Sequence, residues 1–339
     1  MMPGNIARGN TMRRRQFLHL VAGTAAYSAW MRSASAQAFP SRSITMVVPV
    51  PAGGALDTNA RLVASGMSAA LGQTVVIENV TGASGSTGTG RVARSAPDGY
   101  TLIYGANVTH VLNAAVLNLN YDVVADFEPI ALIGKTPWFF AAKQDLPANN
   151  LREMIAWLKE NPDKASLGTA GQGSPSHIAG VLFQNVTGTK FQLIPYRGVA
   201  PVIPDLVSGQ IELSILDPIT SLPQFRAGKI KIFAVLTNKR TANAPDIPTV
   251  DEAGAPGVHM EPWQAIWAPK GTPKDVISRL NAAVASALSD EAISKKFAEQ
   301  SYELTPREHL TPEHLAAFHK SEMDKWFPII KAAGIKAGG

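Results

Sequence analysis

The sequence of 339 residues contains no cysteine. We therefore expect a folded state without disulfides, stabilised by its core, and without the cysteine that carries a lipid anchor. Beyond the N-terminal segment, no run approaches the roughly 20 unbroken apolar residues that a transmembrane helix requires. These absences exclude a disulfide scaffold and predict no membrane-spanning segment in the mature chain.

Acidic residues are missing from residues 1–38, which contain five arginines. Because these are five of the 31 lysines and arginines, the rest of the chain has 26 basic and 26 acidic side chains. The sequence pI of about 9.3 therefore reflects the N-terminal segment. A near-neutral remainder argues against a nucleic-acid-binding surface, which needs clustered positive charge.

The N-terminal segment has the three parts of an export signal. Residues 13–15 are arginines, residues 17–30 are mostly apolar, and residues 34–36 or 36–38 supply small residues for cleavage. The apolar part is too short to span a bilayer. We expect residues 1–38 to be a cleavable signal peptide that directs the chain to the periplasm.

The export route and the start of translation each have two interpretations. Residues 14–18, Arg-Arg-Gln-Phe-Leu, are similar to a twin-arginine signal, which exports folded proteins. Ordinary secretory signals also begin with arginines, so the general secretory route is the alternative. Translation starts at Met1 or at Met12, since residues 1–11 add nothing that a signal needs.

Segments rich in β-formers alternate with segments of helical spacing, which indicates an α/β protein with mostly parallel sheets. Residues 80–90 are rich in Gly, Ser and Thr, and residues 82–88 within them are predicted to form a loop. We predict strands at residues 44–48, 74–78, 100–104, 192–195, 211–216, 231–236 and 263–268, a strand at 130–142 that Gly134 and Pro137 break, and a strand that leads into a glycine loop at 167–173. We predict helices at residues 59–71, 151–161, 174–187, 200–209 and 311–334, and one that starts from a Thr272 cap with Pro273 at the first helical position.

About 300 residues follow the signal, which is more than one core usually contains, so we predict two domains. The first comprises residues 39–136 plus 263–339, and the second comprises residues 137–262. Two chain crossings would then form a hinge, and residues 263–268 would be the returning strand. Ligands of such folds bind at the carboxyl ends of strands and in clefts between domains.

The loop after the first strand is the most informative segment. Pro51-Ala52-Gly53-Gly54 separates that strand from a helix, and Asp57 stands where the helix N-cap is expected. Gly53 and Gly54 have no Cβ, so a ligand can approach the backbone closely. Free N–H groups and the positive end of a helix dipole favour an anion. The alternative is a tight turn without a ligand.

Two further glycine-rich loops offer similar donors. Residues 82–88 lack the Lys-Ser/Thr of a P-loop, so N–H and hydroxyl groups around a carboxylate are favoured over a nucleotide site. Residues 171–177 open a helix that Ser174 or Ser176 would cap, with donors for an anion. An exported hydrolase that uses Ser174 or Ser176 with His177 is the alternative, but neither serine lies in a G-x-S-x-G elbow.

A few isolated residues have two interpretations each. Arg197 would pair with a ligand carboxylate or tie two loops together. Asp217 would accept a hydrogen bond from the ligand or cap the turn before Pro218. Trp138 and Phe139 would line the cleft or pack in the core. His309, His314 and His319 recur at the wrong pitch for a metal site on one helix face, so we expect them to be solvated and predict no metal.

Seven ordered segments together resemble the Bug-type receptors of tripartite tricarboxylate transporters. The match covers nearly all of the mature chain. The segments are Pro51-Ala-Gly-Gly-x-x-Asp57, Pro97-Asp-Gly-Tyr100, Asp126-Phe-Glu-Pro-Ile130, Gly171-x-Gly-Ser-x-x-His177, Pro195-Tyr-Arg-Gly-Val-Ala-Pro201, Ile247-Pro-Thr-Val-x-Glu-Ala-Gly254 and Ala268-Pro-Lys-Gly-Thr-Pro273.

The resemblance implies a hinged two-domain periplasmic-binding-protein fold of type II, with the ligand in a cleft between the lobes. It implies a monomeric receptor that uses no cofactor, captures a small carboxylate and delivers it to an inner-membrane permease of two subunits. A solute-sensing receptor for a signalling partner is an alternative with the same lobes. The implied ligand contacts lie on three loops and near Asp217: Ala52, Gly53, Gly54, Asp57, Ser84, Gly85, Thr87, Gly171, Ser174, Ser176, His177 and Asp217. Arg197 is added as a candidate contact for its guanidinium alone.

The second loop departs from the family pattern. The family often has Gly-Ala-Gly-Gly-Asn-Ile-Gly where this chain has Gly82-Ala-Ser-Gly-Ser-Thr-Gly88. Hydroxyl side chains thus replace a Gly, an Asn and an Ile. For this reason the identity of the carboxylate does not carry over from the family.

Overall fold

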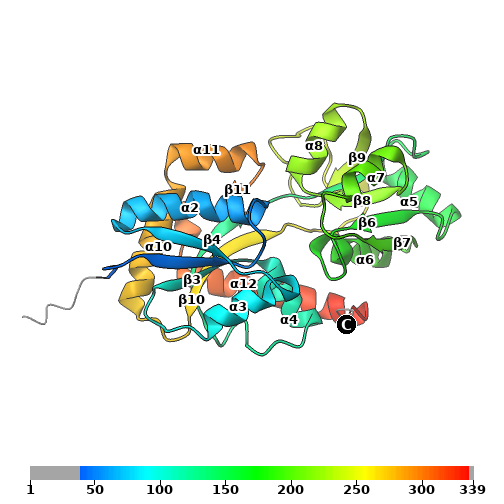
Figure 1. Ribbon diagram of the computed structural model, residues 1–339. Helices are drawn as coiled ribbons and strands as arrows, with labels where there is room; N and C mark the ends of the chain where they lie inside the picture. Colours follow the sequence, from blue (N-terminus) through cyan, green and yellow to red (C-terminus); the bar gives the residue numbers. More distant parts are fainter. Residues whose placement is uncertain (1–38, 336–339) are drawn as a thin grey trace, which may run out of the picture. The chain divides into compact units, whose positions relative to one another are not determined.

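The computed structural model describes residues 39–335. The predicted signal peptide, residues 1–38, lies outside the described residues. From Arg42 onward the chain forms one compact unit with two mixed α/β sheets, each the centre of one lobe (Figure 1). In residues 39–335, none of the helices combines the length and apolar character that a membrane crossing requires.

The sheet of the first lobe has six strands in the order β11-β4-β10-β3-β1-β2. Strand β1 pairs in parallel with β2 and β3, whereas β10 runs antiparallel between β3 and β4. The strands are β1 (Ile44–Val48), β2 (Val75–Asn79), β3 (Thr101–Ala106), β4 (Phe127–Lys135), β10 (Trp263–Pro269) and β11 (Glu303–Leu304).

The helices of the first lobe come from both ends of the described chain. Helices α2 and α10 pack against each other, and α12 packs on β4. They are α2 (Ala55–Leu71), α3 (Ser86–Ala93), α4 (Asn113–Val116), α10 (Lys274–Leu288), α11 (Glu291–Glu299) and α12 (Pro312–Ala332), together with the short 3₁₀ turns η1 (Ala83–Gly85) and η3 (Arg307–His309) and the π-helix η2 (Val108–Leu112).

The sheet of the second lobe has five strands in the order β7-β6-β8-β5-β9. Strands β6, β7 and β8 are parallel, and β5 is antiparallel to β8 and β9. The elements are β5 (Phe139–Lys143), α5 (Leu151–Glu160), β6 (Ser166–Thr169), α6 (Pro175–Thr187), β7 (Gln192–Pro195), α7 (Val202–Ser208), β8 (Leu213–Leu216), α8 (Pro218–Arg226), β9 (Ile230–Val235) and α9 (Val250–Ala253).

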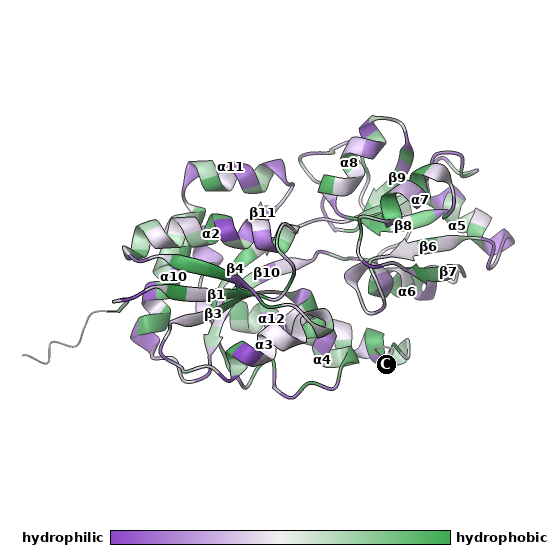
Figure 2. Cartoon of the chain, viewed as in Figure 1, coloured by the Kyte–Doolittle hydropathy of each residue, from purple (hydrophilic) through white to green (hydrophobic). Residues whose placement is uncertain are grey.

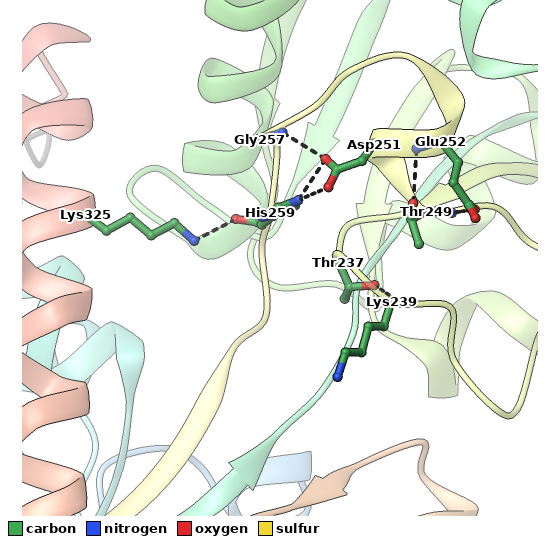
Figure 3. Close-up of polar contacts among 8 residues, drawn as sticks. All are labelled: Thr237, Lys239, Thr249, Asp251, Glu252, Gly257, His259 and Lys325. Atoms are coloured by element: carbon green, nitrogen blue, oxygen red, sulfur yellow. Dashed lines mark hydrogen bonds and ion pairs between the residues drawn. The ribbon is translucent and has the colours of Figure 1, made fainter.

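The chain crosses from the first sheet to the second between β4 and β5 and returns between β9 and β10. The return segment is held by polar contacts (Figure 3). His259 Nε2 lies 2.9 Å from the Asp251 carboxylate, and Lys325 Nζ of α12 donates to the His259 carbonyl at 3.3 Å. This segment is therefore tied to both α9 and α12.

The core consists of the strands and the inner faces of the helices. Figure 2 shows hydrophobic residues concentrated on β8 and β9, whereas hydrophobic and hydrophilic residues alternate along α11. Trp263, Trp267 and Trp326 are fully buried. Trp138 and Phe139 are also buried in hydrophobic clusters, which confirms the core interpretation of these two residues and not the cleft interpretation.

Three predictions about strands and loops were wrong. The sheets are mixed and not mostly parallel, because β5 and β10 enter each sheet from a crossing and pair antiparallel with their neighbours. The predicted strand 130–142 divides near Pro137 into two strands in different sheets, as expected, but Gly134 lies within the first of them and does not break it. The predicted loop 82–88 is helical at its end, because α3 begins at Ser86.

Two helix starts also differ from the prediction. Helix α2 begins at Ala55 with Gly54 as the N-cap, so Asp57 lies in the first turn and does not cap the helix. Helix α10 begins at Lys274 with Pro273 as the N-cap, one position later than expected. Asn150, Ser174 and Thr311 cap α5, α6 and α12, since each side chain accepts a hydrogen bond from a backbone amide of its helix, and Ser174 is one of the two caps expected for α6.

Candidate functional site

Glycine-rich loops from both lobes meet at a cavity of about 580 Å³. Parallel strands place their carboxyl ends at the same edge of a sheet, so the segments after β1, β2 and β3 lie together, as do those after β6, β7 and β8. The cavity is lined by residues 49–51, 81–85, 108, 113, 116 and 117 from the first lobe and by residues 170–175 from the second.

The first loop is fixed by Asp57. Gly53 adopts φ +90, a conformation that favours glycine, and its N–H donates to the Asp57 carboxylate at 2.9 Å. Arg61 Nε and Asn79 Nδ2 donate to the same carboxylate at 3.0 and 2.9 Å. The Gly53 amide is therefore not free, and Asp57, which is 2% exposed, positions the loop. Ala52 and Gly54 are exposed next to the lining residue Pro51.

The charge of Asp57 is stabilised by these contacts. Burial raises the pKa of Asp57, but hydrogen bonds from Arg61, the Gly53 amide and Asn79 outweigh burial and lower the pKa to about 2. The carboxylate is thus ionised at neutral pH, and its oxygens point at protein donors.

The second loop lines the cavity through an unusual backbone. Ala83, Ser84 and Gly85 all have positive φ values, of 45°, 55° and 90°. A Cβ on Gly85 would lie 2.9 Å from Thr109 Cγ2 and 3.1 Å from the Pro49 carbonyl oxygen, so this position requires glycine. Ser84 and Gly85 line the cavity, whereas Thr87 lies in α3 and does not.

The third loop begins helix α6. The His177 amide donates to Ser174 Oγ at 3.3 Å, and the Ala170 amide donates to Ser176 Oγ at 2.9 Å. The two hydroxyls lie 3.1 Å apart. Gly171 and Ser174 line the cavity, but Ser176 and His177 do not. The Ser176 hydroxyl, on a residue 1% exposed, therefore organises the loop.

This geometry offers no serine nucleophile with a histidine base. Among the described residues, His177 Nδ1 is buried without a hydrogen-bond partner, and neither serine hydroxyl bonds to the ring. Burial lowers the pKa of His177, which keeps the ring neutral. The Ser–His pair that the hydrolase alternative requires is not formed.

Arg197 and Asp217 lie outside the cavity lining. Asp217 caps α8 by accepting from the Thr220 amide at 2.9 Å, which supports the cap interpretation. Within residues 39–335, the Arg197 guanidinium has neither a hydrogen bond nor an ion pair, so it does not tie two loops together. The turn that carries Arg197 is close to the third loop, since a Cβ on Gly171 would lie 3.3 Å from the Tyr196 carbonyl oxygen.

The three histidines of the C-terminal segment differ in environment. The rings of His309 and His314 stack at 4.6 Å, but His319 is 5% exposed and its Nε2 donates to the His110 carbonyl at 2.6 Å. The expectation of a solvated His319 was therefore wrong, because α12 turns this residue onto η2. In the part of the chain that the structure describes, no group of three His, Cys, Asp or Glu side chains is placed to hold a metal ion.

Residues after β3 are the part of the site that the sequence analysis missed. Val108, Asn113, Val116 and Leu117 line the cavity, and Asn113 Nδ2 donates to the Ser84 carbonyl at 2.9 Å. The signal was topological, because β3 is parallel to β1 and so the segment that follows it must reach the same edge. The local sequence, without glycine between residues 106 and 120, gave no loop signature.

Comparison with known proteins decides the family. Residues 59–335 match the family model described as the tripartite tricarboxylate transporter family receptor. This chain belongs to that family. Its members are solute-binding proteins of the periplasmic binding protein class and not enzymes, which removes the hydrolase alternative.

Three solved structures show the likeness in detail. The periplasmic binding protein BugD is 36% identical with a TM-score of 0.76, covering 88% of this chain and 99% of BugD. MatC of Rhodopseudomonas palustris, solved with bound malate, is 33% identical with a TM-score of 0.76, covering 86% and 100%. A second R. palustris protein, solved with adipate, is 33% identical with a TM-score of 0.78, covering 88% and 99%. The fold is therefore that of a periplasmic binding protein.

Proposed function

We propose that this receptor captures a small carboxylate in the periplasm and delivers it to an inner-membrane permease of two subunits. The observation that carries the proposal is the cavity of about 580 Å³ between glycine- and serine-rich loops of both lobes. Two relatives of this family were solved with carboxylates, malate and adipate. The family description, a receptor of tripartite tricarboxylate transporters, supports delivery to a transporter.

Binding of a carboxylate would depend on backbone amides and hydroxyls. Ser84 and Gly85 contribute from the first lobe, and Gly171 and Ser174 from the second, at the start of α6. Amides at a helix N-terminus and the helix dipole favour a negative charge. Arg197, which has no partner within residues 39–335, is our candidate for a supporting positive charge at the edge of the site.

We further propose that residues 39–136 plus 263–339 and residues 137–262 act as two domains that close on the ligand as a monomer. The crossings between β4 and β5 and between β9 and β10 would serve as the hinge. A ligand shifts such an equilibrium only by its better contacts in the closed state. Export would remove residues 1–38 through the twin-arginine or the general secretory route.

Thermal unfolding with a panel of small carboxylates tests the proposal. A carboxylate present at 100 times its Kd should stabilise the chain by about 2.7 kcal/mol and raise Tm, with a calorimetric titration confirming one site. Amines or sugars of similar size are the control and should leave Tm unchanged. Absence of any shift across mono-, di- and tricarboxylates would contradict the proposal.

Uptake of the identified carboxylate by cells tests delivery. Deletion of the gene for this chain should abolish uptake while the permease is still present. Normal uptake together with a lost transcriptional response would instead favour the sensing receptor.

A further inference from the structure

We infer that the cavity binds carboxylates with an apolar carbon chain more tightly than carboxylates whose chain carries hydroxyl groups. This inference rests on the proposed function and names the ligand class of the same site. The basis is a division of the cavity wall. One part is built from the loop backbones described above, and the other is built from side chains that cannot form hydrogen bonds.

The apolar part comes from the segment after β3. Val108, Val116 and Leu117 line the cavity, and all three are half-buried. Val116 points at the opposite lobe, because its Cγ2 would lie 3.7 Å from a Cβ on Gly173. Pro175, at the start of α6, adds an apolar ring from the second lobe. A ligand held between the two lobes therefore contacts this apolar surface.

Two polar side chains of the segment after β3, Thr109 and Asn113, donate to protein carbonyls. Asn113 Nδ2 donates to the Ser84 carbonyl at 2.9 Å. Thr109 Oγ1 donates to the Ala106 carbonyl and accepts from the Ala106 amide, both at 3.0 Å. Within residues 39–335, no Lys, Arg, His, Asp or Glu lines the cavity. Hydroxyls of the ligand that face Val108, Val116 and Leu117 would lose water without gaining a hydrogen-bond partner from these side chains.

The energetic consequence has a clear direction. When the methylene chain of a ligand packs against Val108, Val116 and Leu117, its removal from water makes the binding free energy more favourable. A hydroxyl that leaves water without a new hydrogen bond weakens binding, and even one such group is worth about tenfold in affinity. The carboxylate groups would contribute equally to the affinity of both ligand classes, because in both they would contact the glycine- and serine-rich loops.

Two matched ligand pairs test the inference on the full mature chain by calorimetric titration. Adipate and galactarate share six carbons and two carboxylates but differ by four hydroxyls, and succinate and malate differ by one. We expect adipate to bind at least about 10-fold more tightly than galactarate, and succinate more tightly than malate. Equal or tighter binding of the hydroxylated acids overturns the inference and leaves the receptor proposal intact. If the chain binds none of the four acids and no other carboxylate, both the inference and the receptor proposal are contradicted.

Substitution of Val116 locates the cause. Val116→Thr keeps the shape and adds one hydroxyl, so the adipate-to-galactarate ratio should fall severalfold while Tm stays near that of the parent. Val186→Thr, at an exposed site near the end of α6, is the matched control and should leave the ratio unchanged. A ratio that is the same in Val116→Thr as in the parent contradicts the assignment of selectivity to this wall.

Discussion

The cleft and the return crossing use their polar groups in opposite ways. In the crossing, the His259 ring contacts Asp251, the His259 carbonyl accepts from Lys325, and Thr249 and Glu252 form a reciprocal capping box (Figure 3). In the cleft, the loop backbones of both lobes face a cavity of about 580 Å³. The comparison indicates that the polar groups of the crossing pair within the protein, whereas those of the cleft would, on our proposal, pair with a ligand.

We expect the largest difference in carboxylate affinity when valine replaces each of two glycines that have similar backbone conformations. Gly173, in the cleft, has φ +74, and Gly257, in the crossing, has φ +87. Valine strains either position by roughly 1–3 kcal/mol. Gly173→Val should also fill the space toward Val116 and weaken carboxylate binding by at least about 100-fold, equivalent to about 2.8 kcal/mol.

Calorimetric titration and thermal unfolding of both variants separate the effects. Gly257→Val should retain affinity with a similar fall in Tm, since a Cβ there has no neighbour within 4 Å. If Gly173→Val binds as tightly as Gly257→Val, the cavity is not the binding site.

A smaller contrast is expected between two aspartates. The folded-state pKa of Asp57 is about 2 against an ordinary value of 3.8, so its charge stabilises the fold above about pH 4 and this contribution disappears as the pH falls toward 2. The shift corresponds to about 2 kcal/mol. Asp57→Asn should therefore lower the free energy of unfolding by about 2 kcal/mol at pH 7 and by much less near pH 2.

Urea unfolding of both Asp variants across this pH range provides the measurement. Asp251→Asn changes a partly exposed contact with His259 and should cost less than about 1 kcal/mol at pH 7. Equal losses in the two variants, or a loss in Asp57→Asn that does not change with pH, would show that Asp57 does not anchor the first loop.

The smallest contrast is between two helix caps. Ser174 caps α6 at the cleft, and Thr249 caps α9 in the crossing. Alanine at either position should cost about 1 kcal/mol of stability. Only Ser174→Ala should also weaken carboxylate binding, by a few-fold, which parallel unfolding and titration experiments would detect. Weaker binding in Thr249→Ala than in Ser174→Ala would run against the comparison.

Features that depend on neighbouring residues were predictable from the sequence. The bounds of β1 and β7 match the predicted 44–48 and 192–195, because runs of β-formers end at proline or glycine there. The loops that place Ser84, Gly85, Gly171 and Ser174 on the cavity were predictable for the same reason, since glycine and serine mark loops and caps locally.

Features that depend on distant residues were not predictable. The antiparallel pairing of β10 depends on where residues 263–269 return, which no local pattern encodes. The role of Asp57 depends on Asn79, 22 positions away, and on a bend that brings Gly53 back to the carboxylate. Val116 belongs to the cavity only because β3 lies beside β1 and because Gly173 of the other lobe faces it.

A crystal structure of the mature chain with adipate tests the central claim most directly. The account predicts the carboxylate oxygens within hydrogen-bond distance of the loops at residues 81–85 and 170–174, with the methylene chain on Val108, Val116 and Leu117. A second cavity, of about 630 Å³, lies among α2, α8 and α11 and contains none of the predicted contact residues. Adipate bound there, with the first cavity unoccupied, would contradict the account.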